Sequence, residues 1–259
     1  CAALAWAGPK LSPSQRWKWS EARGVPALGV PAFAAQDGEL GYVVARGEAW
    51  ALWRVSLGEV PVWTALPAPP ASLAPRAVWS SDGATLVAVG GERDNIVSAT
   101  AVRFAGGAWT VLPPLPRGRV LHTVTLLGDG TILVVGGRVA ASDTVKSFDA
   151  METGAVLALL PGASAWTALP ALPEPRWLHT ATRLPDGTVL VAGGSNEAQE
   201  NGDSDEMGVS PTWHLDAKRS AWTAAGPLPT PRYGHRAVAT AAGVLVVGQR
   251  GVVVEQHAA

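Results

Sequence analysis

Short apolar runs that end in a pair of glycines dominate the hydrophobic pattern of this chain. In the clearest case, Thr131–Val135 is an apolar run of the kind expected for a strand buried on both faces. A short β-rich run, His122–Leu127, precedes it, and between them lies Asp129-Gly130, a pair that accepts the positive φ of a tight hairpin turn. Gly136-Gly137 follows and allows backbones to approach closely. The pattern predicts an antiparallel hairpin packed closely against its neighbours.

The same run recurs along the chain, which is the signature of a repeat architecture. Leu184–Gly194 repeats the residue order of Leu127–Gly137, and Asp82–Gly91 is a third copy with one extra residue. Two further segments, Asp37–Gly47 and Ala242–Gly248, keep only the apolar pattern. The chain is therefore expected to consist of repeated β units.

Two other elements recur in phase with the glycine pairs. The first is a tryptophan followed in most copies by threonine, and its copies lie at Trp63, Trp109, Trp166 and Trp222, with Trp19 as a candidate fifth. The second is Arg-x-x-His, found at Arg119–His122, Arg176–His179 and Arg232–His235, and replaced by Arg76-x-x-Trp79 in the second repeat. A period of about 50 residues with these three elements in a fixed order resembles the kelch repeat. The resemblance covers the chain from about Trp17 to Gln256, although Gly248-Gln249 replaces the last glycine pair.

The resemblance implies an all-β, kelch-type β-propeller over residues 17–259, preceded by a tail or linker at residues 1–16. We expect five blades of four antiparallel strands, whose first strands begin near Val30, Arg76, Leu121, His179 and His235. In the third blade, Thr144–Phe148 alternates as a third strand and Trp166–Ala168 supplies the fourth. Six blades are the alternative, if residues 1–16 or 150–165 hide a decayed copy.

The last blade lacks an outer strand of its own, because the chain ends soon after Val252–Glu255. The segment Arg16–Ser20 is available at the other end of the sequence. Pairing it beside Val252–Glu255 would remove an open sheet edge. We therefore expect the N-terminal strand to close the propeller.

Charge and cysteine content narrow the functional classes. A net charge of −1, with 16% charged residues, lacks the basic footprint of a nucleic-acid partner. No apolar run approaches the roughly 20 residues that span a bilayer. The single cysteine, Cys1, excludes an internal disulfide and a Cys-based metal site. Cys1 stands where a bacterial lipoprotein carries its lipid, which suggests a secreted or cell-envelope, lipid-anchored monomer; a fragment boundary is the alternative.

By resemblance, the arginine of Arg-x-x-His lies at the channel mouth, and residues after the glycine pair join it in holding partners. Transferred to this chain, the candidate ligand-binding residues are Arg76, Arg119, Arg176, Arg232, Arg93, Arg138 and Asn196. Guanidinium groups pair well with carboxylates, so an acidic protein segment or glycan is the expected partner. The alternative is that each arginine binds a backbone carbonyl of the next blade.

Two metal sites are conceivable, although we expect no cofactor. The histidines that end the Arg-x-x-His motifs could share a metal if all pointed into the channel; they are His122, His179 and His235. The acidic insertion at 195–208 carries Asp203 and Asp205 at a spacing that suits Ca²⁺. A packing role for the histidines and a solvated loop for the insertion are the simpler alternatives.

Enzymatic activity has little support in the sequence. The copper-radical oxidases that resemble kelch proteins need a cysteine linked to a tyrosine, but this chain has only Cys1, Tyr42 and Tyr233. The segment Ser80–Gly83 lacks the spacing of a sialidase Asp-box. We therefore expect a non-enzymatic scaffold that holds a protein or glycan at the channel mouth. A carbohydrate-active enzyme resembling the sialic-acid mutarotases is the alternative. A pocket with a carboxylate within hydrogen-bonding reach of the channel arginines would favour the enzyme, and a flat, arginine-rich rim with no buried acid would favour binding.

Overall fold

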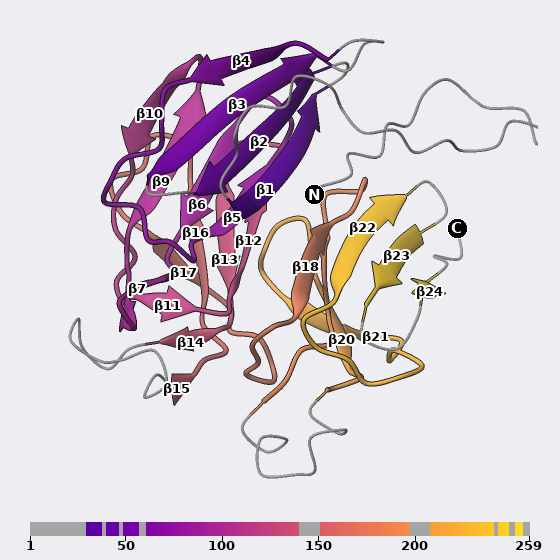
Figure 1. Cartoon of the computed structure of the whole chain (residues 1–259). Helices are drawn as coiled ribbons and strands as arrows, with labels where there is room; N and C mark the ends of the chain where they lie inside the picture. The colour runs from indigo at the N-terminus through magenta and orange to yellow at the C-terminus, as the bar shows by residue number, and fades with distance from the viewer. Residues whose placement is uncertain are drawn as a thin grey trace, which may run out of the picture. The chain divides into compact units, whose positions relative to one another are not determined.

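The computed structural model describes residues 30–37, 40–46, 49–56, 61–139, 151–196, 208–240, 243–248 and 252–255. Every regular element in these ranges is a β-strand, and no helix occurs among them (Figure 1). The predicted all-β class is confirmed. Within the described part of the chain, no helix is long and apolar enough to cross a membrane.

The chain divides into two compact units. The first comprises residues 1–71 together with 105–109, and the second comprises 72–104 and 110–259. In the first unit, one antiparallel sheet has its strands in chain order. Its strands are β1 (Val30–Asp37), β2 (Leu40–Arg46), β3 (Trp50–Ser56) and β4 (Trp63–Leu66).

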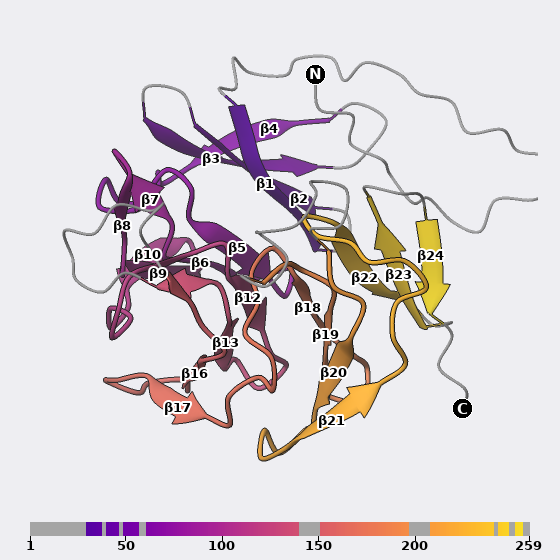
Figure 2. The ribbon, with the colours of Figure 1, turned by 90° about the horizontal axis from the view of Figure 1, so that it is seen from below.

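Four antiparallel sheets of the second unit correspond to the repeats, three with four strands and one with three (Figure 2). Short strands among the described residues of this unit form one further three-stranded sheet and one two-stranded sheet. The strands of the second repeat are β5 (Val78–Ser81), β6 (Leu86–Val89), β9 (Ala101–Ala105) and β10 (Ala108–Val111), whose connecting tip belongs to the first unit. Those of the third are β12 (Thr123–Leu126), β13 (Ile132–Val135), β16 (Val156–Leu159) and β17 (Thr167–Leu169). Those of the fourth are β18 (Thr180–Arg183), β19 (Val189–Ala192), β20 (Thr212–Leu215) and β21 (Trp222–Ala225). The last sheet has β22 (Arg236–Thr240), β23 (Gly243–Val247) and β24 (Val252–Glu255).

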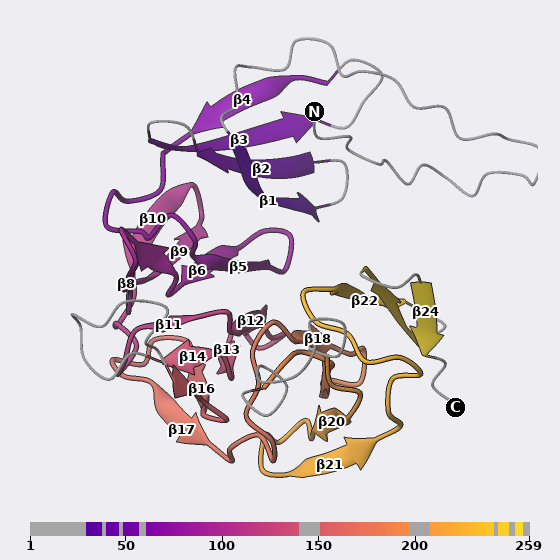
Figure 3. The same ribbon diagram turned by 60° about the horizontal axis from the view of Figure 1, so that its bottom comes forward.

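The first strands of these sheets lie side by side in chain order (Figure 3): β5 beside β12, β12 beside β18, and β18 beside β22. Each of the predicted first strands begins within two residues of the expected position. The sheets of the second unit therefore succeed one another as the repeats do in sequence.

The predicted hairpin turn is confirmed at Asp129-Gly130. Leu126 pairs with Ile132 across it, and Gly130 has a φ of 81°. The Asp129 carboxylate accepts a 2.9 Å hydrogen bond from the backbone N–H of Thr131. An aspartate that bonds its own backbone in this way fixes the turn and thus the register of the strands.

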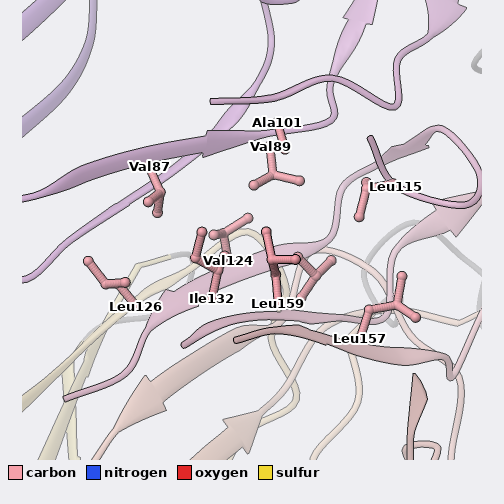
Figure 4. Packing of buried hydrophobic residues seen from close by; sticks show 10 residues of the cluster. Val87, Val89, Ala101, Leu115, Val124, Leu126, Ile132, Leu157 and Leu159 are labelled. Atoms are coloured by element: carbon pink, nitrogen blue, oxygen red, sulfur yellow. The ribbon is translucent and has the colours of Figure 1, made fainter. Parts of the chain in front are cut away.

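The hydrophobic core lies between neighbouring sheets. All four residues are buried in each of the second strands β6, β13 and β19, as the unbroken apolar runs predict. Figure 4 shows one cluster, in which Val87 and Val89 of the second repeat face Val124, Leu126 and Ile132 of the third. Similar clusters join the third sheet to the fourth and the fourth to the last. Adjacent sheets are thus held together chiefly by hydrophobic burial.

The third strand of the third sheet differs from the prediction. It is β16, Val156–Leu159, which is buried throughout and pairs with β13. The predicted segment, Thr144–Phe148, lies outside the described residues. The prediction relied on alternation, but this strand is buried on both faces and reads as a continuous apolar run. Val156–Leu159, within the stretch 150–165, therefore belongs to the third sheet.

Closure by the N-terminal segment lies outside the described residues, which begin at Val30. The last sheet has three strands within the described ranges. The five-blade count and the pairing of Arg16–Ser20 beside β24 stay predictions.

The repeated tryptophans link successive outer strands. All four repeated tryptophans are half-buried: Trp63, Trp109, Trp166 and Trp222. Three of the indole N–H groups donate to a proline carbonyl just after the previous outer strand: Trp109 to Pro67 at 2.7 Å, Trp166 to Pro113 at 2.8 Å and Trp222 to Pro170 at 2.8 Å. Each ring therefore adds a directional contact to its packing.

Short strands also form where the glycine pairs end. In the second repeat they are β7 (Glu92–Arg93) and β8 (Ile96–Val97), which pair as a hairpin. In the third repeat they are β11 (Arg119–Val120), β14 (Arg138–Val139) and β15 (Met151–Glu152). These strands carry several of the candidate binding residues.

Candidate functional site

The Arg-x-x-His segments adopt one conformation in three repeats. Their third residue has a left-handed backbone, with φ of 56° at Leu121, 52° at Leu178 and 61° at Gly234. The N–H of Leu178 donates to the Leu121 carbonyl at 3.0 Å, and the N–H of Gly234 donates to the Leu178 carbonyl at 2.8 Å. This backbone ladder joins the third, fourth and last repeats at the starts of their first strands. Holding two leucines in a conformation that favours glycine costs energy that the ladder must offset.

The arginines of these three segments are buried, although the resemblance implied that they lie at the channel mouth. Arg119 is 3% exposed, and Arg176 and Arg232 are each 1% exposed. Their Nη1 groups donate to the carbonyl of the glycine-pair region of the same repeat: Arg119 to Gly136 at 3.1 Å, Arg176 to Gly193 at 3.1 Å and Arg232 to Gly248 at 3.3 Å. Desolvation by burial lowers the pKa of Arg119 to about 10, so the group remains charged at neutral pH. Ligand binding by these three stays untested, but their contacts are those of structural ties.

The backbones of the same arginines also connect successive repeats. The second glycine of each pair donates its N–H to the carbonyl of the arginine in the next repeat: Gly91 to Arg119 at 2.9 Å, Gly137 to Arg176 at 2.8 Å and Gly194 to Arg232 at 2.8 Å. The alternative expected from the sequence was a side-chain bond to the next blade. The structure instead shows a side-chain bond within the repeat and a backbone bond between repeats.

The motif histidines occupy the same junctions. His122, His179 and His235 are 4%, 5% and 2% exposed. The first glycine of the preceding repeat lies against each ring, since a Cβ built on Gly136 would lie 2.8 Å from His179 Cε1 and one built on Gly193 would lie 2.6 Å from His235 Cε1. Only glycine leaves room for the imidazole there. The histidines therefore fix the packing distance between repeats.

Hydrogen bonds and burial explain the protonation of these rings. His179 Nε2 lies 3.1 Å from Thr123 Oγ1, and His235 Nε2 lies 3.1 Å from Thr180 Oγ1, so both bridge to the preceding first strand. Desolvation, followed by the charge of Arg176, lowers the pKa of His179 to about 3. Desolvation and then Arg119 hold the pKa of His122 well below its usual value. The histidines are thus neutral at physiological pH.

The metal-site hypotheses have different outcomes. In the described ranges, no three His, Cys, Asp or Glu side chains gather as a metal-binding group, so the structure does not bring the three histidines together as one. Each ring lies at its own junction instead. The calcium candidates Asp203 and Asp205 lie outside the described residues, as does Cys1, the lipidation candidate.

Arg76 occupies the equivalent position in the second repeat, yet its environment is different. Its side chain is 79% exposed, and Nη1 forms an ion pair of 2.7 Å with Glu92 Oε1. Glu92 directly follows the glycine pair Gly90-Gly91 and its side chain is 13% exposed. The second repeat also has Trp79 in place of histidine. Of the four repeated arginines, Arg76 is the one whose guanidinium faces solvent.

The three residues predicted after the glycine pairs make different contacts. Arg93 is exposed and donates from Nη2 to the Leu73 carbonyl at 2.9 Å. Arg138 is half-buried and its guanidinium lies 4.8 Å from the centre of the Trp177 ring, a cation–π distance. Asn196 is half-buried at the edge of the described part of its loop. The structure therefore does not gather the predicted site residues into one cluster.

A pocket of about 320 Å³ lies beside the β7–β8 hairpin. Arg93, Asp94 and Ile96 of the hairpin region contribute to it, and the opposite wall comes from the loop before Arg76. The remaining lining residues are Ser72, Ala74, Val97 and Ser98. Ile96 is 46% exposed, so the pocket offers an apolar surface beside charged groups.

Sequence reasoning missed Glu92 and Trp177 as partners of the candidate arginines. Glu92 is the residue directly after a glycine pair, so its place in the repeat was a usable signal. Trp177 occupies a variable position of Arg-x-x-His, and nothing in the sequence marks it as the surface under Arg138. Both contacts depend on loop geometry.

The repeated sheets and their shared junctions define a repeat protein of the β-propeller class. No family model matches the chain. Among curated proteins it is 32% identical over 128 residues to Kelch-like protein terF of Aspergillus terreus, covering 49% of this chain and 26% of that protein. It is 33% identical over 148 residues to human Kelch-like protein 34, covering 56% of this chain and 20% of that protein. The chain thus matches about a quarter or less of the length of these relatives.

A solved structure of YjhT has a similar fold, with a TM-score of 0.66 at 16% sequence identity. The match covers 87% of this chain and 74% of that one. The resemblance to kelch-repeat propellers, first inferred from the glycine pairs and tryptophans, is confirmed by these comparisons.

Proposed function

We propose that the chain is a kelch-type binding module that holds an acidic protein segment on the loops following its glycine pairs. The observation that carries this proposal is that some of the repeated polar residues are buried between repeats, whereas others are exposed. Three motif arginines and three motif histidines are buried in the junctions between repeats. The exposed polar and apolar groups of the second repeat lie instead on the β7–β8 hairpin and the loop before β5, around the pocket.

The exposure of the aspartate and glutamate side chains favours a binding module over a carbohydrate-active enzyme. Among residues whose burial the structure describes, no aspartate or glutamate falls in the fully buried class. Arg176 does meet Glu174 at 2.8 Å, but that glutamate is 44% exposed. A general acid or base usually needs a desolvated setting that tunes its pKa. The described arginines therefore lack the buried acid that a carbohydrate-active enzyme would show.

The pocket residues allow a direct test of the proposed face. Labelled acidic peptides and acidic glycans should be titrated against the wild type and the Ile96→Asp variant, which adds a like charge beside the pocket. We expect the wild type to retain acidic peptides and the variant to bind them at least several-fold more weakly. Val111→Asp is the control, since Val111 is 65% exposed on the outer strand β10.

The outcomes separate the candidate functions. Equal binding by both variants would place the binding face elsewhere. Retention of glycans alone, with faster interconversion of the anomers of an acidic sugar, would favour the enzyme that resembles sialic-acid mutarotases. Loss of peptide binding in Ile96→Asp alone would support the module proposed here.

A further inference from the structure

Arg76 is held in one orientation while half of its guanidinium stays unused. Nη1 donates to Glu92 at 2.7 Å. Within the described ranges, Nε and Nη2 make no hydrogen bond. These two N–H groups form the side edge of the guanidinium, which matches the two oxygens of a carboxylate. With 79% of its side chain exposed, Arg76 presents this edge to an incoming ligand.

The backbone around this pair is closely packed. A Cβ built on Gly91 would lie 2.6 Å from the Arg76 carbonyl oxygen and 2.4 Å from the Ala77 nitrogen, so the residue just before strand β7 contacts the backbone of residues 76–77 directly. Glu92 is the first residue of β7 and pairs with Val97 across the hairpin. Both partners of the ion pair therefore start from fixed backbone positions. Such preorganisation lowers the entropy lost when a ligand binds.

The pocket is built from the same two segments. One wall is the loop through Ser72 and Ala74, which continues to Arg76 two residues later. The other is the hairpin that begins with Glu92 and contributes Arg93 and Ile96. A ligand held at Arg76 thus has a partly apolar cavity nearby for a neighbouring side chain.

The other repeated arginines lack this freedom. Arg119 and Arg176 each direct Nη1 to two backbone carbonyls, and Arg176 also pairs with Glu174 through Nη2. Both are at most 3% exposed. In the second repeat, the arginine is therefore exposed and oriented by a carboxylate, whereas Arg119 and Arg176 are buried and bonded to backbone carbonyls.

We infer that Arg76 is the carboxylate receptor of this chain and that Glu92 is its positioning residue. A glutamate or aspartate of a partner peptide accepts two hydrogen bonds from Nε and Nη2 of Arg76, while Nη1 stays on Glu92. A small aliphatic residue next to that acid enters the pocket against Ile96. This assignment rests on the proposed function and names the chemistry of its partner.

The test uses a short fluorescein-labelled peptide in which glutamate alternates with valine, and a matching glutamine–valine peptide. Fluorescence anisotropy with the full chain should show tighter binding of the glutamate peptide. Arg76→Ala should weaken that binding by about ten-fold, as expected for loss of a charge-assisted hydrogen-bonded pair. Arg76→Lys should restore only part of it, since an ammonium cannot form the planar two-bond contact. Lys218→Ala, at an exposed turn after β20, is the matched control and should change nothing.

A double-mutant cycle separates positioning from a structural role. Glu92→Gln should weaken peptide binding about three-fold in the wild type and leave it unchanged in the Arg76→Ala background, because its effect passes through Arg76. Equal losses from Glu92→Gln in both backgrounds would overturn the positioning role. Binding that survives Arg76→Ala would overturn the receptor assignment and leave the proposed function standing. Failure of the wild type to prefer the glutamate peptide would overturn the acidic partner as well.

Discussion

The second and fourth repeats place the same arginine in opposite settings. In the fourth repeat, Arg176 is 1% exposed and donates to the carbonyls of Gly193 and Pro211 at 3.1 and 2.8 Å. In the second repeat, Arg76 is 79% exposed and contacts one carboxylate. The fourth repeat has His179 three residues later, whereas the second has Trp79. The difference teaches that a repeated residue serves the fold where its whole motif is intact, and is exposed to solvent where the motif has changed.

The largest expected effect that would sharpen this comparison is acid destabilisation of the histidine junctions. In the folded state, desolvation keeps the pKa of His179 at about 3 and that of His122 well below 6.5. An unfolded histidine titrates near 6.5, so the unfolded chain binds more protons between these values. Stability is therefore complete above pH 6.5 and is lost as the pH falls toward the folded pKa. His179 and His235, whose folded pKa values are about 3 and about 4, should each cost about 1.4 kcal/mol per pH unit, or roughly 4 kcal/mol together by pH 5. His122 adds to the loss in the same direction.

Denaturant unfolding at pH 7 and pH 5 measures this loss, and NMR titration of the imidazole resonances measures its origin. Imidazole signals of His122 and His179 that titrate near 6.5 in the folded protein would contradict the buried, neutral junctions. The second repeat has Trp79 in place of the motif histidine, so this position adds nothing to the pH dependence.

The glycine pairs should give the next largest effect. Gly193→Ala places a methyl group 2.6 Å from both the Arg232 carbonyl oxygen and His235 Cε1, at a φ of 58°. Overpacking and the left-handed backbone should together cost roughly 3 kcal/mol. Gly106→Ala is a matched control, because Gly106 has the same φ of 58° and open space around it. In thermal or denaturant unfolding, Gly106→Ala should lose only about 1 kcal/mol of stability, which is the part that the left-handed backbone accounts for. Equal losses for Gly106→Ala and Gly193→Ala would show that the junction at Gly193 is not closely packed.

The sequence predicted the repeated sheets because their determinants are local. Apolar runs such as Leu133–Val135, the Asp129-Gly130 turn and the repeated tryptophans each fix a short segment. It could not predict which arginines are accessible, because Arg76 and Arg176 precede similar runs and differ in contacts made by residues 16 to 35 positions away. The third strand of the third sheet was misplaced for a related reason: alternation at 144–148 looked more strand-like than the buried apolar run at Val156–Leu159.

The smallest effect concerns the indole hydrogen bonds. Trp222→Phe keeps most of the ring but leaves the Pro170 carbonyl without its 2.8 Å donor, which should cost about 1 kcal/mol. At Trp63 the buried Nε1 has no acceptor among the residues described in the structure. Trp63→Phe should therefore cost clearly less than Trp222→Phe in equilibrium unfolding. A larger loss at Trp63 would show that its indole makes an equally important bond beyond the described residues.

The most direct test of the contrast between the second and fourth repeats compares the free energies of unfolding of two variants, Arg76→Ala and Arg176→Ala. Arg176→Ala leaves the carbonyls of Gly193 and Pro211 without a donor and should lower the free energy of unfolding by roughly 3–5 kcal/mol. Arg76→Ala removes one side chain that is 79% exposed and should change the free energy of unfolding by less than about 1 kcal/mol. Denaturant unfolding of both variants beside the wild type provides the comparison. Equal losses, or a larger loss for Arg76→Ala, would contradict the account that the second repeat has released its arginine from a structural role.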